Sequence, residues 1–319
     1  MQGRRSKMDK TVFLFPGQGS QSVGMGKDFH ETYPSVRALF EEASETLSMD
    51  FRKLCFEGPE AVLVETENVQ PAITLVNASC LEVLKGRGVP PAGAAGHSLG
   101  EYSALYAAGV VTFADLMRLV RNRGLFMKDA AGKHPGSMAA VMGLGIETIE
   151  DICKDVAESG SVEIANYNSP GQIILSGEKA GLEKAMEEAK TRGAKMVVPL
   201  RVSGAWHSRF MEEAKSAMRE FLAGIPFQRA AIPVIANATG DYEDDPQSIK
   251  ENLIRQLTSP VLWVDTIRRF RADGYSAFLE VGPGRVLRGL VKDIDRQADA
   301  ANVENGRSLE KFLEKEAAK

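Results

Sequence analysis

The stretch Gly96 to Val110, GHSLGEYSALYAAGV, places Ser98 between two glycines in the pattern Gly-x-Ser-x-Gly. A catalytic serine needs an exposed Oγ on a sharp turn from a strand into a helix, and the two glycines relieve the crowding of that turn. After Ser98, the residues Leu99, Tyr102 and Leu105 recur at helical spacing. The pattern therefore predicts a nucleophilic serine, with a structural turn serine as the alternative.

A serine hydroxyl is a weak nucleophile without a base, and four histidines are available. His207 lies in VSGAWHSRFMEEAKSAM, where Ser203 is expected to cap a helix that holds His207 in its first turn. The positive end of a helix dipole disfavours imidazolium, so the ring would stay neutral and able to accept a proton. His207 is the predicted base, and a surface histidine at a helix cap is the alternative.

No Asp or Glu between Ser98 and His207 is a convincing third member of a hydrolase triad. In SIKENLIRQLTSPVLW, Gln256 instead falls at helical spacing from Ile249 and Leu253, on the apolar face, where an amide needs a partner. Its side-chain carbonyl could accept the second ring N–H of His207. A glutamine that faces solvent at the helix end is the alternative.

The glycine-rich loop FPGQGSQSVGMG follows a strand-like run, so a nucleotide site must be considered. The dinucleotide pattern fails at Ser22, and the P-loop pattern lacks its Gly-Lys-Ser/Thr. Such a loop could instead aim the main-chain N–H of Gln18, together with that of Leu99, at a developing oxyanion. A non-catalytic nucleotide-binding module is kept as an alternative function.

Arg123 falls on the apolar stripe of the helix predicted over Phe113 to Ala130, in line with Leu116, Val120 and Met127. An unpaired charge that faces the core would cost about 3–5 kcal/mol, so Arg123 needs an anionic partner. That partner is either a structural Asp or Glu or the carboxylate of a ligand held by a bidentate pair.

The chain alternates strand-like and helix-like segments, which predicts an α/β fold. Between about Gly136 and Val202 the order is β-α-β-β-α-β, typical of a ferredoxin-like unit. We expect this subdomain at 133–203, inserted into a main catalytic domain at 10–132 and 204–300. Residues 1–9 are expected to be a disordered leader, and the charged segment 301–319 a peripheral tail.

The 319 residues carry 39 basic and 43 acidic side chains, a balance that gives no indication of nucleic-acid binding. Three scattered cysteines predict neither a zinc site nor a disulfide framework, and they favour a reducing cytoplasm. No stretch approaches the length of a membrane span. We expect a cytoplasmic protein with no metal, no nucleic acid and no membrane partner.

The blocks FPGQGSQ, GHSLGEYSAL, NSPGQ, VSGAWHS and QLTSPVLW with EVGPGRVL occur together in this order. The sequence thereby resembles the malonyl-CoA:acyl-carrier-protein transacylases from about Thr11 to about Lys292. The resemblance implies a hydrolase-like α/β core with a ferredoxin-like insertion. It also implies a role for each matching residue: Ser98 as nucleophile, His207 as base, Gln18 and Leu99 as the oxyanion hole, Arg123 as the holder of the malonyl carboxylate, and Gln256 as the residue whose carbonyl orients the histidine.

The implied activity is transfer of the malonyl group from malonyl-CoA to the phosphopantetheine thiol of acyl carrier protein, by a ping-pong mechanism through a malonyl-serine ester. No permanently bound cofactor is expected, since malonyl-CoA is the substrate. A serine thioesterase and a polyketide-pathway acyltransferase are the alternative enzymes. Asn168 and Gln172 match a motif of the family, but their chemistry predicts no role.

Overall fold

The structure is a computed structural model that describes residues 10–318, so the predicted leader at 1–9 lies outside the described residues. The strands are β1 (Thr11–Phe15), β2 (Gly93–Gly96), β3 (Ser137–Met142), β4 (Val162–Ser169), β5 (Gln172–Gly177), β6 (Met196–Pro199), β7 (Val234–Ile235), β8 (Tyr242–Glu243), β9 (Ala277–Val281) and β10 (Asp299–Val303).

The helices are α1 (Lys27–Thr32), α2 (Pro34–Leu47), α3 (Glu60–Leu63), α4 (Thr66–Gly86), α5 (Gly100–Ala107), α6 (Phe113–Lys133), α7 (Ile146–Asp155), α8 (Lys179–Thr191), α9 (Glu212–Ala223), α10 (Pro246–Gln256), α11 (Trp263–Ala272), α12 (Val286–Ile294) and α13 (Gly306–Ala317). Short helical turns are η2 (Lys53–Glu57), η3 (Ala157–Ser159) and η4 (Arg209–Met211).

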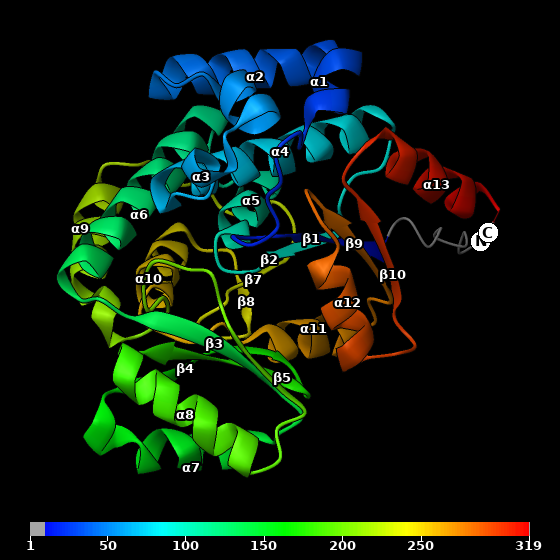
Figure 1. The fold of residues 1–319 in the computed structure, drawn as a ribbon. Coiled ribbons are helices and arrows are strands. Elements are labelled where there is room, and N and C mark those ends of the chain that lie inside the picture. The colour runs from blue at the N-terminus through cyan, green and yellow to red at the C-terminus, as the bar shows by residue number, and fades with distance from the viewer. Residues whose placement is uncertain (1–9, 319) are drawn as a thin grey trace.

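The larger sheet has the strand order β10-β9-β1-β2-β7-β8 and lies at the centre of the molecule (Figure 1). Its neighbouring strands are parallel except for the short pair β7–β8. Every residue of β1 is buried, because helices cover both faces of a parallel sheet. Side chains alternate along the strand, so Phe13 and Phe15 join one hydrophobic cluster, while Val12 and Leu14 join another.

Helices of the N-terminal half cover one face of this sheet, and α11 and α12 cover the other (Figure 1). Helix α4 is buried from Thr66 to Leu81 without interruption, which places it inside the larger cluster. Helix α6 packs against α4 and α9, so its apolar stripe, which includes Arg123, faces the interior.

The smaller sheet is antiparallel, with the order β4-β5-β3-β6. Its elements follow in the order β3-α7-β4-β5-α8-β6, as the sequence predicts. Helices α7 and α8 cover one face of the sheet, on the side away from the larger sheet (Figure 1). Alternate side chains such as Met138, Ala140 and Ile174 point to the other face and join the main core. The predicted α/β class is confirmed: a largely parallel sheet stands beside a separate antiparallel one.

Main-chain hydrogen bonds connect the two sheets. The N–H of Tyr167 on β4 donates to Val261 O at 2.9 Å, and the N–H of Val261 donates to Ala165 O at 2.9 Å. Val261 lies five residues after Gln256, the last residue of α10. The smaller sheet is therefore hydrogen-bonded to the segment that follows α10.

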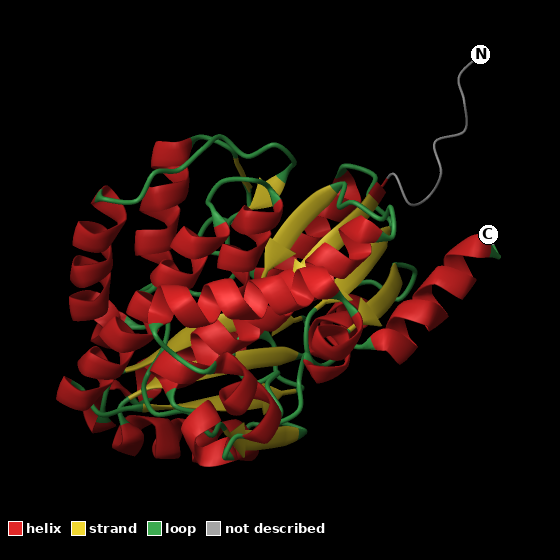
Figure 2. Cartoon of the chain, turned by 90° about the horizontal axis from the view of Figure 1, so that it is seen from above, coloured by secondary structure: helices red, strands yellow, loops and turns green. Residues whose placement is uncertain are grey.

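The segment 301–319, predicted as a peripheral tail, contains the end of β10 and helix α13. Strand β10 pairs with β9 at the edge of the larger sheet, and the sequence analysis did not anticipate it. Helix α13 buries Leu309 and Phe312 and lies at one side of the molecule (Figure 2). Within residues 10–318, no helix has the length and apolar character needed to cross a membrane.

Replacing Gly100 with Ala tests the contact between α5 and β1. A Cβ at Gly100 would lie 1.9 Å from Phe15 O, a main-chain atom in the centre of the sheet that cannot move aside. We expect Gly100→Ala to lower the free energy of unfolding by at least about 3 kcal/mol, measured by urea denaturation. The matched control is Gly132→Ala on α6, where a Cβ meets nothing within 4 Å. That variant should be neutral or more stable by about 0.5–1 kcal/mol, and equal effects of the two changes would contradict the packing argument.

Candidate active site

Ser98 stands on the turn between β2 and α5, with a left-handed φ of 52°. The flanking glycines are required by sterics, since a Cβ at Gly96 would lie 1.9 Å from the main chain of Gly100. The Ser98 N–H donates to Asn237 Oδ1 at 2.7 Å, and Asn237 Nδ2 donates to Gly96 O at 2.7 Å. The Asn237 amide thus holds both sides of the turn, a role that the sequence analysis missed. Its position just after β7, beside the end of β2, is the signal that could have found it.

His207 lies against Ser98, with its Nε2 at 2.7 Å from the serine Oγ. Its other ring nitrogen, Nδ1, lies 2.9 Å from the main-chain oxygen of Gln256. A carbonyl oxygen can only accept, so Nδ1 carries the proton and Nε2 is free to accept the hydroxyl proton of Ser98. The ring is 4% exposed, so this orientation is protected from water.

The sequence analysis attributed the neutrality of His207 to the positive end of a helix dipole, and this reason is wrong. Helix α9 begins only at Glu212, and His207 has a left-handed φ of 58° in the turn before η4. Burial of the ring, and next the positive charge of Arg123, lower the pKa of His207 to about 3. The ring is therefore neutral for a different physical cause than the dipole of a helix.

Gln256 is buried, as predicted, but its side-chain carbonyl does not meet the histidine. The main-chain oxygen makes that contact, while Gln256 Oε1 accepts from Arg123 Nη2 at 2.9 Å. The amide nitrogen of Gln256 donates to Ser98 O at 2.9 Å and to Glu101 Oε2 at 2.6 Å. The residue thus contacts the nucleophile, the base and the arginine at once.

Arg123 is 1% exposed and reaches the nucleophile from α6. Its Nη2 donates to Ser98 Oγ at 3.1 Å and its Nη1 donates to Gln70 Oε1 at 2.9 Å. Its Nε has no hydrogen-bond partner, and within residues 10–318 no carboxylate lies within ion-pair distance of the guanidinium. Burial lowers the pKa of Arg123. The sequence left two possible partners for Arg123, a structural Asp or Glu and the carboxylate of a ligand. Among the described residues, an Asp or Glu in contact with the guanidinium is ruled out.

The main-chain N–H groups of Gln18 and Leu99 have no acceptor among the described residues. The loop of Gln18 is pressed onto the nucleophile turn, because a Cβ at Gly17 would lie 2.4 Å from His97 O and 3.5 Å from Leu99 N. Unpaired main-chain donors beside a serine Oγ can stabilise an oxyanion that forms there.

His97, next to the nucleophile, has a partner from the smaller sheet. Its Nε2 lies 2.7 Å from Asn168 Oδ1, and Asn168 Nδ2 donates to Gln172 Oε1 at 3.0 Å. The His97 ring also packs on Trp263, with centroids 5.4 Å apart. Asn168 and Gln172, which had no predicted role, therefore connect the adjoining ends of β4 and β5 to the turn that bears Ser98.

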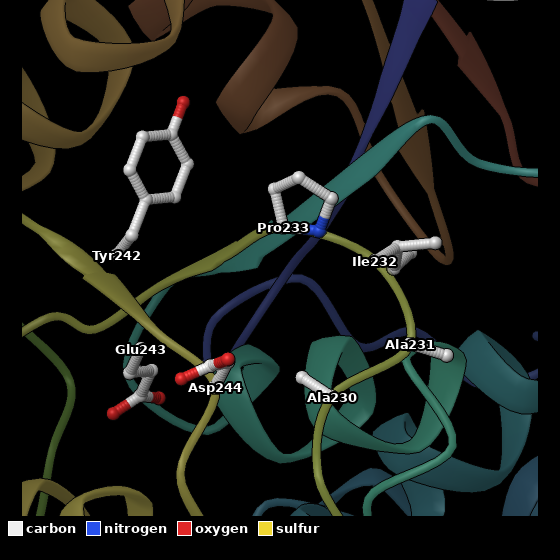
Figure 3. Close-up of a pocket in the computed structure, with 7 residues that line it drawn as sticks. All are labelled: Ala230, Ala231, Ile232, Pro233, Tyr242, Glu243 and Asp244. Atoms are coloured by element: carbon white, nitrogen blue, oxygen red, sulfur yellow. The ribbon is translucent and has the colours of Figure 1, made fainter.

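The described residues hold no group of three or more His, Cys, Asp or Glu side chains arranged to bind a metal ion. A pocket of about 380 Å³ lies between β8 and the segment that leads into β7. Tyr242, Glu243 and Asp244 line one side of it and residues 230–233 the other (Figure 3). None of the six predicted site residues lines this pocket.

Comparisons with known proteins identify the class. Residues 12–311 match the acyl transferase domain family, and the chain belongs to that family. It is 44% identical over 304 residues to the malonyl CoA-acyl carrier protein transacylase of Bacillus subtilis, covering 95% of this chain and 96% of that protein. It is 37% identical over 298 residues to the transacylase of the same name from Staphylococcus aureus, covering 93% and 96%.

Solved structures agree with this assignment. The acyl carrier protein S-malonyltransferase of Vibrio cholerae superposes with a TM-score of 0.91 at 41% identity, covering 95% of this chain and 99% of that one. A malonyl-transacylase in complex with its type II PKS acyl-carrier protein superposes with a TM-score of 0.93 at 40% identity, covering 96% and 99%. The chain is therefore an acyltransferase whose relatives are malonyl transacylases.

The low pKa of His207 predicts how Ser98 reactivity depends on pH. A histidine whose pKa is lowered to about 3 stays in its basic form as the pH falls, so labelling of Ser98 by a fluorophosphonate probe should be constant from pH 7.5 to 5. A histidine with the ordinary pKa of about 6.5 would lose roughly thirtyfold of its basic form at pH 5. The variant His134→Gln, at a half-exposed histidine, is the control and should give the same profile. A rate that falls with a midpoint near pH 6.5 would contradict the buried neutral ring.

Proposed function

We propose that this protein transfers the malonyl group from malonyl-CoA to the phosphopantetheine thiol of acyl carrier protein through a malonyl-serine ester at Ser98. The observation that carries the proposal is the position of Arg123, a buried guanidinium 3.1 Å from the nucleophilic oxygen with no carboxylate in contact. Such a group recognises an acyl chain that ends in a carboxylate. The names of the relatives support the same substrate.

In the first half-reaction, His207 Nε2 takes the Ser98 hydroxyl proton as Oγ attacks the thioester carbon. The carbonyl oxygen becomes an oxyanion, which the N–H groups of Gln18 and Leu99 stabilise. When the intermediate collapses, the carbon–sulfur bond breaks and His207 returns the proton to the sulfur. CoA leaves as a thiol, and the malonyl-serine ester remains.

The second half-reaction reverses these steps with a different thiol. His207 takes the proton of the phosphopantetheine thiol, whose sulfur attacks the ester carbon, and the oxyanion forms in the same place. Collapse breaks the bond to Oγ, and His207 protonates the serine. Throughout, the hydrogen bond from Nδ1 to Gln256 O keeps the imidazole in the tautomer that both halves need.

The architecture that we infer is a hydrolase-like α/β core at 10–132 and 204–300 with a ferredoxin-like subdomain at 133–203. The turn of Ser98 between a parallel strand and a helix supports the first assignment. The antiparallel order β6-β3-β5-β4 and the two helices on one face support the second. The tail at 301–319 then closes the edge of the core through β10 and α13.

We further propose that no cofactor is bound permanently, because the two half-reactions need only the side chains and main-chain donors named above. Malonyl-CoA and acyl carrier protein are the proposed partners, with neither nucleic acid nor membrane involved. Cys55, Cys80 and Cys153 are free thiols, which supports the proposed cytoplasmic location.

Mass spectrometry of the protein mixed with malonyl-CoA tests the covalent step. We expect the mass of one malonyl group to appear on the peptide that contains Ser98, and to disappear when phosphopantetheinylated carrier protein is added. The variant Ser98→Ala should gain no such mass. CoA release that continues without any acceptor would indicate a thioesterase instead, and an adduct at another residue would refute the mechanism.

Replacing Arg123 with Ala tests substrate recognition. We expect kcat/KM for loading from malonyl-CoA to fall by about 10³-fold or more, while loading from acetyl-CoA changes much less, because only malonyl presents a carboxylate. The control is Arg118→Ala on the same helix, an exposed residue paired with Asp115, which should leave both activities intact. Equal losses for the two acyl groups in Arg123→Ala would remove its proposed role.

A further inference from the structure

A second charged side chain lies behind the site, and the mechanism above does not use it. Glu101 occupies the first turn of α5 and is completely buried. Its Oε2 accepts from Gln256 Nε2 at 2.6 Å and from the main-chain N–H of Asn237 at 3.2 Å, while Oε1 has no partner. A buried carboxylate with one oxygen unpaired is costly, so its position needs an explanation.

The Gln256 amide stands between this carboxylate and the arginine. Its Oε1 accepts from Arg123, and its Nε2 donates to Glu101. Only one of the two orientations of the amide satisfies both charged groups, because an oxygen cannot donate and an NH₂ group cannot accept. Glu101 thereby fixes Gln256, whose main-chain oxygen holds His207.

Glu101 is also the carboxylate whose charge acts on Arg123. No Asp or Glu side chain in the described range forms an ion pair with the guanidinium. Burial lowers the pKa of Arg123, and Tyr102 and then the Glu101 charge oppose that shift. A buried cation needs a compensating charge nearby when no substrate is bound. Glu101 is placed to supply it.

We propose that Glu101 is a positioning residue and the resident counter-charge of Arg123, which orients the Gln256 amide and competes with the carboxylate of the substrate for the guanidinium. The inference rests on the proposed function, since it assumes that a substrate carboxylate binds Arg123. When that carboxylate arrives, two buried anions share one cation. Binding of the substrate and protonation of Glu101 must then favour each other by the same factor.

The direction of the effect follows from the protonation of Glu101. Burial raises the pKa of Glu101 to about 7, against the lowering effects of the hydrogen bonds from Gln256 and Asn237 and of the Arg123 charge. Below this pKa Glu101 is neutral, the guanidinium is uncompensated, and the substrate carboxylate binds tightly. Above it the ionised Glu101 takes up part of the positive charge, and malonyl binding weakens.

Four other titratable groups lie around Glu101. On α6 the facing group is Arg123, which remains cationic. On β8 it is Glu243, whose pKa burial and the Glu101 charge raise well above its usual range. On α5 itself, burial raises the pKa of Tyr102 far above neutrality, and across the site the pKa of His207 is lowered to about 3. Of the two buried carboxylates, Glu101 is the one that accepts from the Gln256 amide bound to Arg123, and the variants below assign the effect to it.

The experiment measures single-turnover loading of Ser98 from pH 6 to pH 8.5 in the full-length protein, with malonyl-CoA and with acetyl-CoA. In the wild type, the malonyl-CoA concentration that gives half the maximal rate should rise about tenfold over this range, a change worth about 1.4 kcal/mol. The corresponding value for acetyl-CoA should stay constant, because acetyl has no carboxylate. This comparison also removes any effect of titration of the CoA phosphates.

Two variants assign the effect to Glu101. In Glu101→Gln the half-saturating concentration of malonyl-CoA should no longer rise with pH. In Glu101→Asp, which keeps the charge, that concentration should still rise. The matched control is Glu280→Gln, which removes another buried carboxylate, one that accepts from the main-chain N–H groups of Leu287 and Arg288 and not from Gln256. In that variant the half-saturating concentration of malonyl-CoA should rise with pH as it does in the wild type.

The outcomes separate the two proposals. A wild type that never gains malonyl mass would overturn the proposed function and, with it, this inference. A wild type that is loaded but shows the same pH dependence for malonyl-CoA and acetyl-CoA would overturn the role of Glu101 alone. The role of Glu101 would also be overturned if the half-saturating concentration of malonyl-CoA rose with pH in folded Glu101→Gln as it does in the wild type. Because the comparison of the two acyl groups uses the wild type, the inference can fail even if Glu101→Gln does not fold.

Discussion

Both reactive side chains stand on backbone in the left-handed region, with φ at 52° for Ser98 and 58° for His207. A residue with a side chain pays about 1–3 kcal/mol to stay there, so neighbouring contacts must hold each one in place. For Ser98 those contacts are the flanking glycines and the Asn237 amide, and for His207 the main-chain oxygen of Gln256. These contacts sustain the backbone strain that lets the two side chains meet at 2.7 Å.

The buried charge of Arg123 links substrate recognition to the protonation state of the base, His207. Its guanidinium touches Ser98 and Gln256, and its field contributes to the low pKa of His207. A cation that selects an acyl group with a carboxylate therefore also keeps the imidazole neutral and able to take a proton. One helix, α6, supplies this group from the stripe that faces the core.

Much of this arrangement could be predicted from the sequence, because periodicity and glycine spacing report on packing. The inward position of Arg123 and the turn of Ser98 both follow from such patterns. The main-chain contact of Gln256 could not be predicted, since any residue has a carbonyl and only the end of α10 aims it. Nor could Glu101, because an acid in the first turn of a helix usually faces solvent, and only the fold buries it.

The hydrogen bonds between β4 and Val261 have a mechanical consequence for the alignment of His207. Val261 lies five residues after Gln256, whose main-chain oxygen holds the imidazole. A displacement of the smaller sheet would therefore pull on the chain that leads back to this oxygen. The two main-chain hydrogen bonds thus couple the position of the smaller sheet to the orientation of the base.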